Sequence, residues 1–153
     1  MDIRYRIMKK GDEHRACALV ETVFNELVAP GYSPEGIGEF FKYASPEAMA
    51  ARSDTGQVAV VAEHEGDMVG VIEMVAYSHV SLLFVGRRGQ GIARELFRIA
   101  LEACRSMNPE LSEVTVNSST YARAAYEKLG FTPTGPQQEK SGIVFVPMVC
   151  NVN

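Results

Sequence analysis

A short stretch in the middle of the chain, LLFVGRRGQGIARELF at residues 82–97, restricts the fold more than any other. It begins with an apolar run typical of a buried strand. It ends in the i, i+4, i+7 apolar spacing of a helix at Ile92, Leu96 and Ile99. Between the two lie three glycines and two arginines. A strand followed by a glycine-rich turn and a helix predicts an anion site. The first N–H groups of the helix have no partners within it, and glycines without side chains let a ligand approach them.

Two familiar phosphate-binding motifs do not fit this turn. The P-loop requires lysine followed by serine or threonine after its glycines, and no such pair follows here. The dinucleotide fingerprint requires a third glycine, and Arg94 occupies that position. An alternative without a ligand is that the glycines allow tight packing and that Arg87 and Arg88 only solvate the loop. The pattern by itself leaves both interpretations open.

The overall composition favours a small anionic ligand over nucleic acid. The chain has 153 residues, of which 46% are apolar and 22% charged, and this predicts a single globular domain over residues 1–153. The net charge of −4 and the pI of about 5.4 give no basic surface of the kind that nucleic acids require. The two arginines of the turn are therefore a local feature.

The same composition predicts a cytoplasmic protein. No stretch is apolar enough to cross a membrane, and the N-terminus lacks the apolar core of a signal sequence. Cys17, Cys104 and Cys150 are far apart and match no metal or redox motif, so reduced thiols and no bound metal are expected.

Hydrophobic periodicity predicts strands and helices in alternation. Strands are expected at residues 3–7, 57–63, 68–77, 79–85, 111–117 and 142–149, with another starting near 131–133. Helices are expected after Asp12 as N-cap, after Ser33, after Ser45, from Ile92, and over 118–131 with Gly130 as its stop. This order predicts a mixed sheet with helices on its faces.

The segment RGQGIA at residues 88–93 matches R/Q-x-x-G-x-G/A, the pyrophosphate motif of the GNAT superfamily of N-acetyltransferases. YEKLGF at 126–131 resembles the C-terminal signature of that family, and residues 66–85 resemble its central hairpin and following strand. The chain resembles bacterial members of unassigned acceptor. The resemblance implies an α/β fold on a mixed α+β sheet, in the GNAT-type order β-α-α-β-β-β-α-β-α-β-β of acyl-CoA N-acyltransferases. The turn from Val85 to Arg88 is shorter than usual, which leaves the register of the pyrophosphate contacts open.

The resemblance also implies acetyl-CoA as the cosubstrate. Main-chain groups of Leu83, Phe84 and Val85 would bind pantetheine along the central strand. The pyrophosphate would lie in the turn made by Arg88, Gly89, Gln90, Gly91, Ile92 and Ala93, and Asn117 would contact the cofactor from the next strand. As an alternative for the segment after Asn117, Ser118 or Ser119 would cap the following helix.

Three residues are candidates for the chemistry. Tyr126 matches the family's tyrosine, which implies a general acid for the departing thiolate; the alternative is a tyrosine packed on the apolar face of its helix.

The amine must lose a proton before it attacks, and two residues compete as the base. His79 lies where several family members carry a basic glutamate, and Glu73 lies on the adjacent strand. Their alternatives are a lone histidine near a turn and a glutamate on a solvated strand face. An N–H group near Leu83 or Phe84 would hold the oxyanion.

The segment at residues 24–41 is expected to select the acceptor. Phe24, Glu26, Tyr32, Glu35 and Phe40 form an aromatic and acidic set that could receive a cationic amine, and burial of the two phenylalanines in the core is the alternative. Polyamine, amino acid, aminoglycoside and protein N-terminus all stay open, and so does a homodimer.

The predicted function is transfer of an acetyl group from acetyl-CoA to a primary amine, by direct attack in a ternary complex. The acceptor would be a small molecule or a peptide, with neither nucleic acid nor membrane as a partner. The alternative is a catalytically silent acyl-CoA-binding sensor or interaction module of the same fold.

Overall fold

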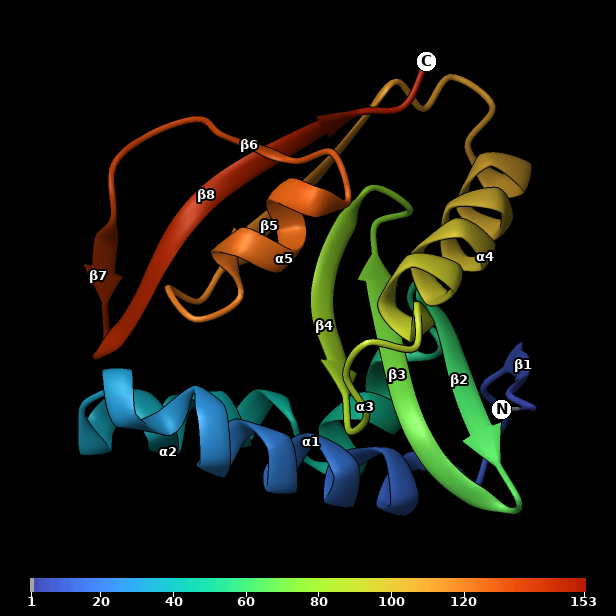
Figure 1. The fold of residues 1–153 in the computed structure, drawn as a ribbon, viewed down its shortest axis with the longest axis horizontal. Helices are drawn as coiled ribbons and strands as arrows, with labels where there is room; N and C mark the ends of the chain where they lie inside the picture. The colour runs from blue at the N-terminus through green and yellow to red at the C-terminus, as the bar shows by residue number, and fades with distance from the viewer. Residues whose placement is uncertain (1) are drawn as a thin grey trace.

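The computed structural model describes residues 2–153, and these form eight strands, five α-helices and one short 3-10 helix (Figure 1). The strands are β1 Arg4–Ile7, β2 Val58–His64, β3 Asp67–Val75, β4 His79–Val85, β5 Glu113–Ser118, β6 Thr132–Pro133, β7 Gln138–Lys140 and β8 Ile143–Asn151. The helices are α1 Glu13–Leu27, η1 Ala29–Gly31, α2 Pro34–Tyr43, α3 Pro46–Arg52, α4 Ile92–Met107 and α5 Arg123–Lys128. No helix in this part of the chain is long and apolar enough to cross a membrane.

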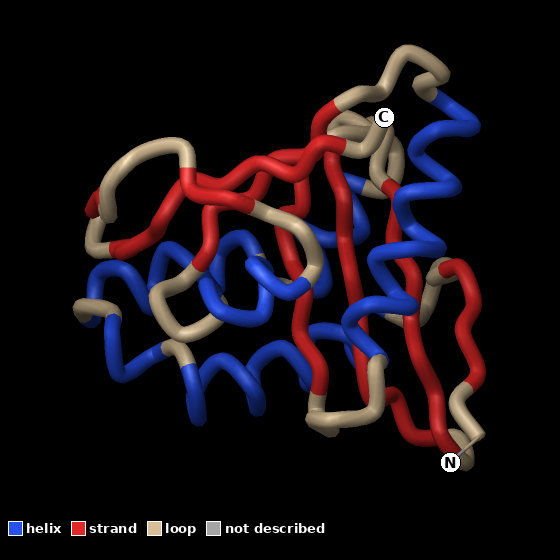
Figure 2. The backbone as a smooth tube through the Cα atoms, turned by 45° about the horizontal axis from the view of Figure 1, so that its top comes forward, coloured by secondary structure: helices blue, strands red, loops and turns tan. Residues whose placement is uncertain are grey.

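The strands form one mixed sheet in the order β1-β2-β3-β4-β5-β8-β6, with β7 paired to β8 off this path. β4 and β5 run parallel, and the other described pairs run antiparallel. Helices lie outside the strand layer, as Figure 2 shows. This arrangement confirms the predicted mixed sheet with helices on its faces.

Alternating side chains on β2 and β3 build a hydrophobic core on each face of the sheet. Val60 and Ile72 are fully buried in the cluster that includes the apolar side of α4. Val61 and Val71 are fully buried in the opposite cluster, under α1 and α3. Successive strand residues point to opposite faces, so a strand that is covered on both sides reads as a continuous apolar run.

The start of α4 is held against the sheet at Gly70 of β3. A Cβ atom at this glycine would lie 2.9 Å from a side-chain carbon of Ile92 and 3.0 Å from one of Leu96. The missing side chain lets the first turns of α4 pack directly on the strand. The glycine turn between Val85 and Ile92 is therefore anchored at both ends, by β4 before it and by the packed helix after it.

β4 and β5 pair over only two residues, His79 with Thr115 and Val80 with Val116. Beyond this point they spread apart: in Figure 1, β4 continues down beside β3, whereas β5 runs toward the lower left with β8. Parallel strands that separate leave main-chain N–H and C=O groups of β4 without partners on the side of β5. Such groups need other partners, which can be supplied by water or by a ligand.

The two halves of the molecule meet again at the far end of this gap, where α2 contacts the turn before β8. Gly36 of α2 lies so close to Gly142 that a Cβ atom on Gly36 would overlap the carbonyl group of Gly142. Figure 1 shows α2 beside the end of the β7–β8 hairpin. The gap between β4 and β5 is thus bounded by helices and by this hairpin.

All three predicted N-cap positions are confirmed, and two of the three residues cap their helix through the side chain. The Ser33 and Ser45 side chains each accept a hydrogen bond from the backbone N–H three residues later, and proline follows each of them. Asp12 is the N-cap residue of α1, as predicted, but its side chain makes no capping hydrogen bond. Its carboxylate instead accepts hydrogen bonds from Arg6, at 2.7 Å, and from the N–H of Lys9, at 2.9 Å. The arginine competes for the oxygens that would have capped the helix.

Some predicted boundaries are also corrected. β3 ends at Val75 rather than at Tyr77, because Ala76 and Tyr77 have positive φ angles of 53° and 54° and form a turn. α5 is shorter than predicted, because β5 and a turn take up residues 118–122. Gly130, with φ of 106°, follows the end of α5 as expected. β7 was not predicted, since its residues QEK show no apolar alternation.

Candidate active site

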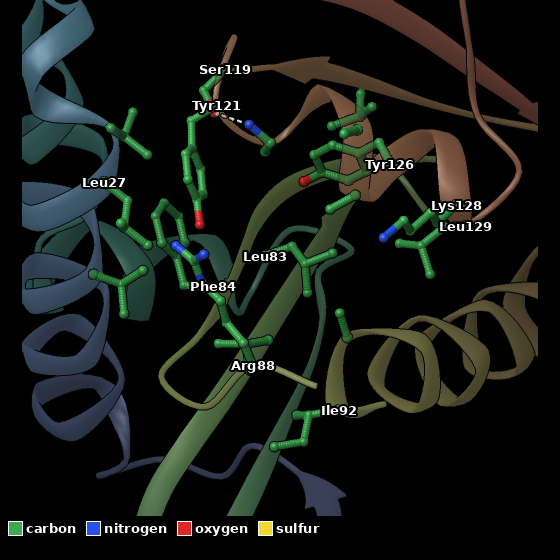
Figure 3. A pocket seen from close by; sticks show the side chains of 18 of the residues that line it. Leu27, Leu83, Phe84, Arg88, Ile92, Ser119, Tyr121, Tyr126, Lys128 and Leu129 are labelled. Atoms are coloured by element: carbon green, nitrogen blue, oxygen red, sulfur yellow. Dashed lines mark hydrogen bonds between the residues drawn. The ribbon is translucent and has the colours of Figure 1, made fainter. Parts of the chain in front are cut away.

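A cavity of about 600 Å³ lies where β4 and β5 separate (Figure 3). It is lined by β4, the glycine turn, the start of α4, the β5–α5 connection and α5, with α1 and α2 across from them. Most of the predicted site residues meet here: Leu83, Phe84, Val85, Arg88, Gly89, Gly91, Ile92, Ala93, Asn117 and Tyr126. Gln90, His79 and Glu73 are not among the lining residues.

The glycine turn presents bare backbone to this cavity. Gly89 and Gly91 have φ angles of 75° and 69°, a conformation that residues with a side chain rarely adopt. A Cβ atom on either would meet nothing within 4 Å, so the space in front of them is open. Gly91 is the N-cap of α4, and the N–H groups of Ile92 and Ala93 lack acceptors within the helix. The helix dipole adds partial positive charge at this end, so the site suits an anion.

Cationic side chains surround the glycine turn. The charged residues that line the cavity are Arg87, Arg88, Arg94 and Lys128. Arg94 also donates a hydrogen bond of 3.0 Å to the carbonyl oxygen of Lys128, which ties the start of α4 to the end of α5. This charge fits the phosphate groups of a nucleotide-like cofactor.

Arg88 reaches across the cavity to Tyr121 in the β5–α5 connection. The central guanidinium carbon lies 5.1 Å from the centre of the Tyr121 ring, within the range of a cation–π contact. Figure 3 shows the guanidinium near the hydroxyl end of that ring, on the side of the cavity toward α1. Both side chains are exposed, so the contact leaves them accessible to a ligand.

The β4 wall offers main-chain groups. Leu83, Phe84 and Val85 lie beyond the last β4–β5 pair, and all three line the cavity. Asn117 lines the opposite wall, at the point where β5 has turned away. Ser119 accepts a hydrogen bond of 3.1 Å from the N–H of Ala122 in the turn before α5. The N-cap of α5 is Ala122, without a side-chain hydrogen bond, so the alternative that Ser118 or Ser119 caps this helix is not confirmed.

Tyr126 projects from α5 into the cavity (Figure 3). The residue is 7% exposed, and its ring packs edge-on against Phe131 with 5.4 Å between ring centres. Burial raises the pKa of the Tyr126 hydroxyl well above its ordinary value of 10.0, because the phenolate would be poorly solvated. The hydroxyl therefore carries its proton throughout the neutral range. The packing interpretation is confirmed, because the ring packs in the core. The general-acid role stays a prediction, and the position of the hydroxyl at the cavity is compatible with it.

His79 lies at the opposite end of β4 from the glycine turn. Its Nδ1 atom lies 2.7 Å from the hydroxyl oxygen of Thr115, the residue that faces it on β5. Burial lowers the pKa of His79 below its ordinary value of 6.5. The imidazole is therefore neutral at pH 7, as a base must be, but it does not line the cavity.

Glu73 is fully buried, so the interpretation of this residue as part of a solvated strand face is wrong. Arg52 of α3 pairs with its carboxylate at 3.0 Å, and the side chains of Gln57, Tyr43 and Ser81 also donate hydrogen bonds to it. Ser81, at 2.6 Å, also lines the cavity. Glu73 thus lies one residue behind the cavity wall.

A β-bulge explains the position of Ser81. The pairing of β3 with β4 shifts after Glu73, where Glu73 faces Leu82 and Met74 faces Val80. Ser81 is the extra residue of the bulge, and its side chain turns toward Glu73.

The part of the cavity under α1 and α2 is apolar and aromatic. It is lined by Val23, Leu27, Val28, Tyr32, Phe40 and Phe84. Phe40 stacks on the fully buried Phe24 with 3.9 Å between ring centres, so Phe24 belongs to the core and Phe40 to the cavity wall. Glu26 and Glu35 are exposed and do not line the cavity, which corrects the expectation of an acidic acceptor site.

The cysteines are packed in the interior. All three are buried, and the sulfur of Cys104 lies 3.8 Å from that of Met74. Burial raises the pKa of the Cys17 and Cys104 thiols to about 11, so they remain protonated at neutral pH and are poor nucleophiles.

Comparison of the sequence with models of known protein families gives one match. A family model described as the acetyltransferase (GNAT) domain matches residues 28–152. The chain belongs to the GNAT acetyltransferase family. The match confirms the family expected from RGQGIA and YEKLGF, and with it an acetyl-CoA-dependent acetyltransferase. Among curated proteins no match is found.

Solved GNAT structures share the fold over almost the whole chain. A GCN5-related N-acetyltransferase from Rhodopseudomonas palustris superposes with a TM-score of 0.81 at 20% identity, covering 99% of this chain and 97% of its own. PaiA N-acetyltransferase from Thermoplasma acidophilum, in complex with coenzyme A, gives 0.80 at 17% identity and covers 99% and 100%. An aminoglycoside 6'-N-acetyltransferase from Enterococcus faecium gives 0.69 at 14% identity and covers 99% and 97%. These likenesses confirm the GNAT acyltransferase fold.

Several residues of the GNAT cavity were missed in the sequence, among them Ser81, Tyr121 and Lys128. Tyr121 is a large aromatic residue with 45% exposure just before α5, and an exposed aromatic beside a predicted site is a usable signal. Ser81 gave no signal, because a bulge that turns it toward Glu73 cannot be read from the strand pattern.

Proposed function

We propose that the protein is an N-acetyltransferase that moves an acetyl group from acetyl-CoA to a primary amine by direct attack in a ternary complex. One observation carries this proposal: a helix N-terminus suited to an anion, an unpaired strand edge and a buried tyrosine hydroxyl all face one cavity. The coenzyme A complex of PaiA N-acetyltransferase, which shares the fold, supports the choice of cosubstrate.

In this proposal, acetyl-CoA supplies the activated acetyl group as a thioester. The N–H groups at Gly91, Ile92 and Ala93, with Arg88 nearby, would bind its pyrophosphate. The edge of β4 at Leu83–Val85 would bind the amides of its pantetheine arm, with Asn117 on the other wall. The open space in front of Gly89 and Gly91 gives room for such a ligand to approach the backbone.

The chemical step forms one C–N bond and breaks one C–S bond. The neutral amine attacks the thioester carbonyl, and a main-chain N–H of β4 near Leu83 or Phe84 would stabilise the oxyanion. The thiolate then leaves with the bonding electrons, and Tyr126 protonates it. The nitrogen gives up its extra proton to water, and the Tyr126 phenolate takes a proton from water, which restores the enzyme. The hydroxyl is protonated at neutral pH, so it has a proton to donate. The burial that raises its pKa also makes it a weaker acid, so the transfer depends on direct contact between the hydroxyl and the departing sulfur.

The two candidates for the base receive different roles in this proposal. His79 does not line the cavity, and the Glu73 carboxylate receives hydrogen bonds from four side chains, which leave little of it open to a further proton. We propose that Glu73 instead orients the Ser81 side chain, which donates a hydrogen bond to its carboxylate. His79 remains the candidate base and would have to act through water.

Binding and turnover test the proposal in sequence. Acetyl-CoA at 100 times its Kd should stabilise the fold by about 2.7 kcal/mol, which raises the melting temperature by roughly 5–10 °C in a domain of this size. Release of CoA thiol is then followed with a panel of primary amines. No thermal shift at millimolar acetyl-CoA would refute the cosubstrate. Binding without turnover of any amine would favour the silent acyl-CoA-binding sensor.

A further inference from the structure

The acceptor half of the cavity has a chemistry of its own. Its apolar lining comes from the end of α1, the connection between α1 and α2, Phe40 of α2, and β4. The wall is built on an aromatic cluster in which Phe40 stacks on Phe24 at 3.9 Å and meets Phe84 edge-on at 5.9 Å. Tyr32 packs on Phe24 at 5.3 Å. Such a wall is rigid and favours apolar groups, because each aromatic ring buries a large area.

Carboxylates are missing from this wall. Within the described chain, every charged residue that lines the cavity is an arginine or a lysine. Glu26 and Glu35, from the same helices, are exposed outside it. The carboxylate of Glu73 lies behind the wall, where Arg52 already pairs with it at 3.0 Å. A substrate with several positive charges would lose water on entry and find no lining carboxylate in return.

Ser81 is the polar group that the acceptor half does offer. Its hydroxyl donates to Glu73 Oε1 at 2.6 Å, so its proton is committed to the interior. A hydroxyl oxygen has two lone pairs, so even with the Tyr43 hydroxyl beside it the Ser81 oxygen has acceptor capacity for the cavity that it lines. The side chain can therefore accept a hydrogen bond from the N–H of an amine.

We infer that the acceptor is a molecule with a single primary amine on an aromatic or branched apolar body. The body lies against Phe40, Tyr32 and Phe84, and the amine nitrogen donates to the Ser81 oxygen. This inference rests on the proposed N-acetyltransferase function and narrows its substrate class. The inferred acceptor differs from that named for the aminoglycoside 6'-N-acetyltransferase of the same fold, because aminoglycosides carry several amines.

The test compares kcat/KM for four amines with acetyl-CoA saturating. Two are apolar, 2-phenylethylamine and 3-methylbutylamine, and two are polycations, spermidine and kanamycin. The expected result is a kcat/KM at least tenfold higher for both apolar amines. Higher kcat/KM for either polycation would overturn the inference and leave the acetyltransferase function standing. No turnover of any amine would instead refute the function on which the inference rests.

Leu27 gives a matched pair of variants on the acceptor wall. It lines the cavity from the last turn of α1 and is half-buried, so a longer polar side chain can be accommodated. Leu27→Glu should raise kcat/KM for 1,5-diaminopentane relative to pentylamine at least tenfold, because it adds the missing carboxylate. Leu27→Gln has almost the same size without the charge and should leave that ratio as in the parent protein. An equal ratio in Leu27→Glu and Leu27→Gln would overturn the inference.

Ser81 is tested by removing and restoring its hydroxyl. Ser81→Ala should raise KM for 2-phenylethylamine at least tenfold without changing the Kd of CoA, and Ser81→Thr, which keeps a hydroxyl on a strand, should recover most of that loss. Melting temperatures identify any general loss of fold. An unchanged KM in a folded Ser81→Ala protein would overturn the assignment of Ser81 as the amine's partner.

Discussion

Replacing Gly91 by alanine separates the two reasons for a glycine at the start of α4. The first reason is conformational, because φ at Gly91 is 69° and a Cβ atom is unfavourable there. The second is access, because a Cβ atom would enter open space at the mouth of the helix, where the pyrophosphate is proposed to bind. The first affects the stability of the fold, and the second affects only the bound state.

Each reason has a magnitude. Forcing an alanine into the left-handed region costs about 1–2 kcal/mol, which lowers the melting temperature by roughly 2–8 °C in a domain of this size. If the methyl group prevents one charge-assisted hydrogen bond between the backbone and the pyrophosphate, binding loses about 1.5–3 kcal/mol. This corresponds to roughly a ten- to hundredfold higher Kd for CoA.

Gly66→Ala is the matched control. Gly66 lies in the β2–β3 turn with φ of 86°, and a Cβ atom there would also meet nothing within 4 Å. It carries the same kind of backbone strain but does not line the cavity. Calorimetric unfolding should show similar losses of stability in the two variants. Titration calorimetry should show weaker CoA binding only in Gly91→Ala. If both variants bind CoA within twofold of the parent protein, the helix-mouth site is refuted.

Three further predictions concern single side chains. Tyr126→Phe should lower kcat by about a hundredfold or more and leave the Kd of CoA within twofold in calorimetry; full turnover across the pH range would exclude the general acid. Glu73→Gln leaves the Arg52 guanidinium without its counter-charge and should cost about 3–5 kcal/mol in urea unfolding, whereas the exposed Glu102→Gln should cost less than about 0.5 kcal/mol. Burial lowers the pKa of His79 in the folded state below its ordinary value of 6.5, so the unfolded state binds the proton more readily. The free energy of unfolding is therefore unaffected by His79 above pH 6.5 and decreases as the pH falls below that value. His79→Gln should flatten this dependence in thermal unfolding, and an unchanged slope would mean that another group causes it.

The elements that the sequence predicted well are those set by neighbours along the chain. Ser33 and Ser45 cap their helices because the partner N–H groups lie only three residues away. The apolar spacing after Gly91 is enough to define α4, and β4 was predicted with its observed ends. The RGQGIA motif works in the same way, since a glycine turn and a helix start are both local features.

The errors arise where distant residues compete. Asp12 is the N-cap residue of α1, but its carboxylate accepts a hydrogen bond from Arg6 of β1 in place of a helix N–H. Glu73 follows the same strand alternation as a solvated residue would, yet α3 covers it and supplies Arg52. Glu26 and Glu35 lie in the right segment but on the exposed sides of their helices. In each case the deciding partner or covering element comes from another part of the fold.

The sequence by itself determined the family, the order of strands and helices, and the backbone that can bind a pyrophosphate, because motif, periodicity and turn chemistry act over a few residues. Only the tertiary structure decided that β4 and β5 separate after two paired residues and leave a cavity that Tyr126 can face. It also decided the character of the acceptor half, with aromatic rings in the wall, carboxylates outside it and Ser81 turned toward Glu73 by a bulge. These features depend on which surfaces pack together, and packing joins residues that are far apart along the chain.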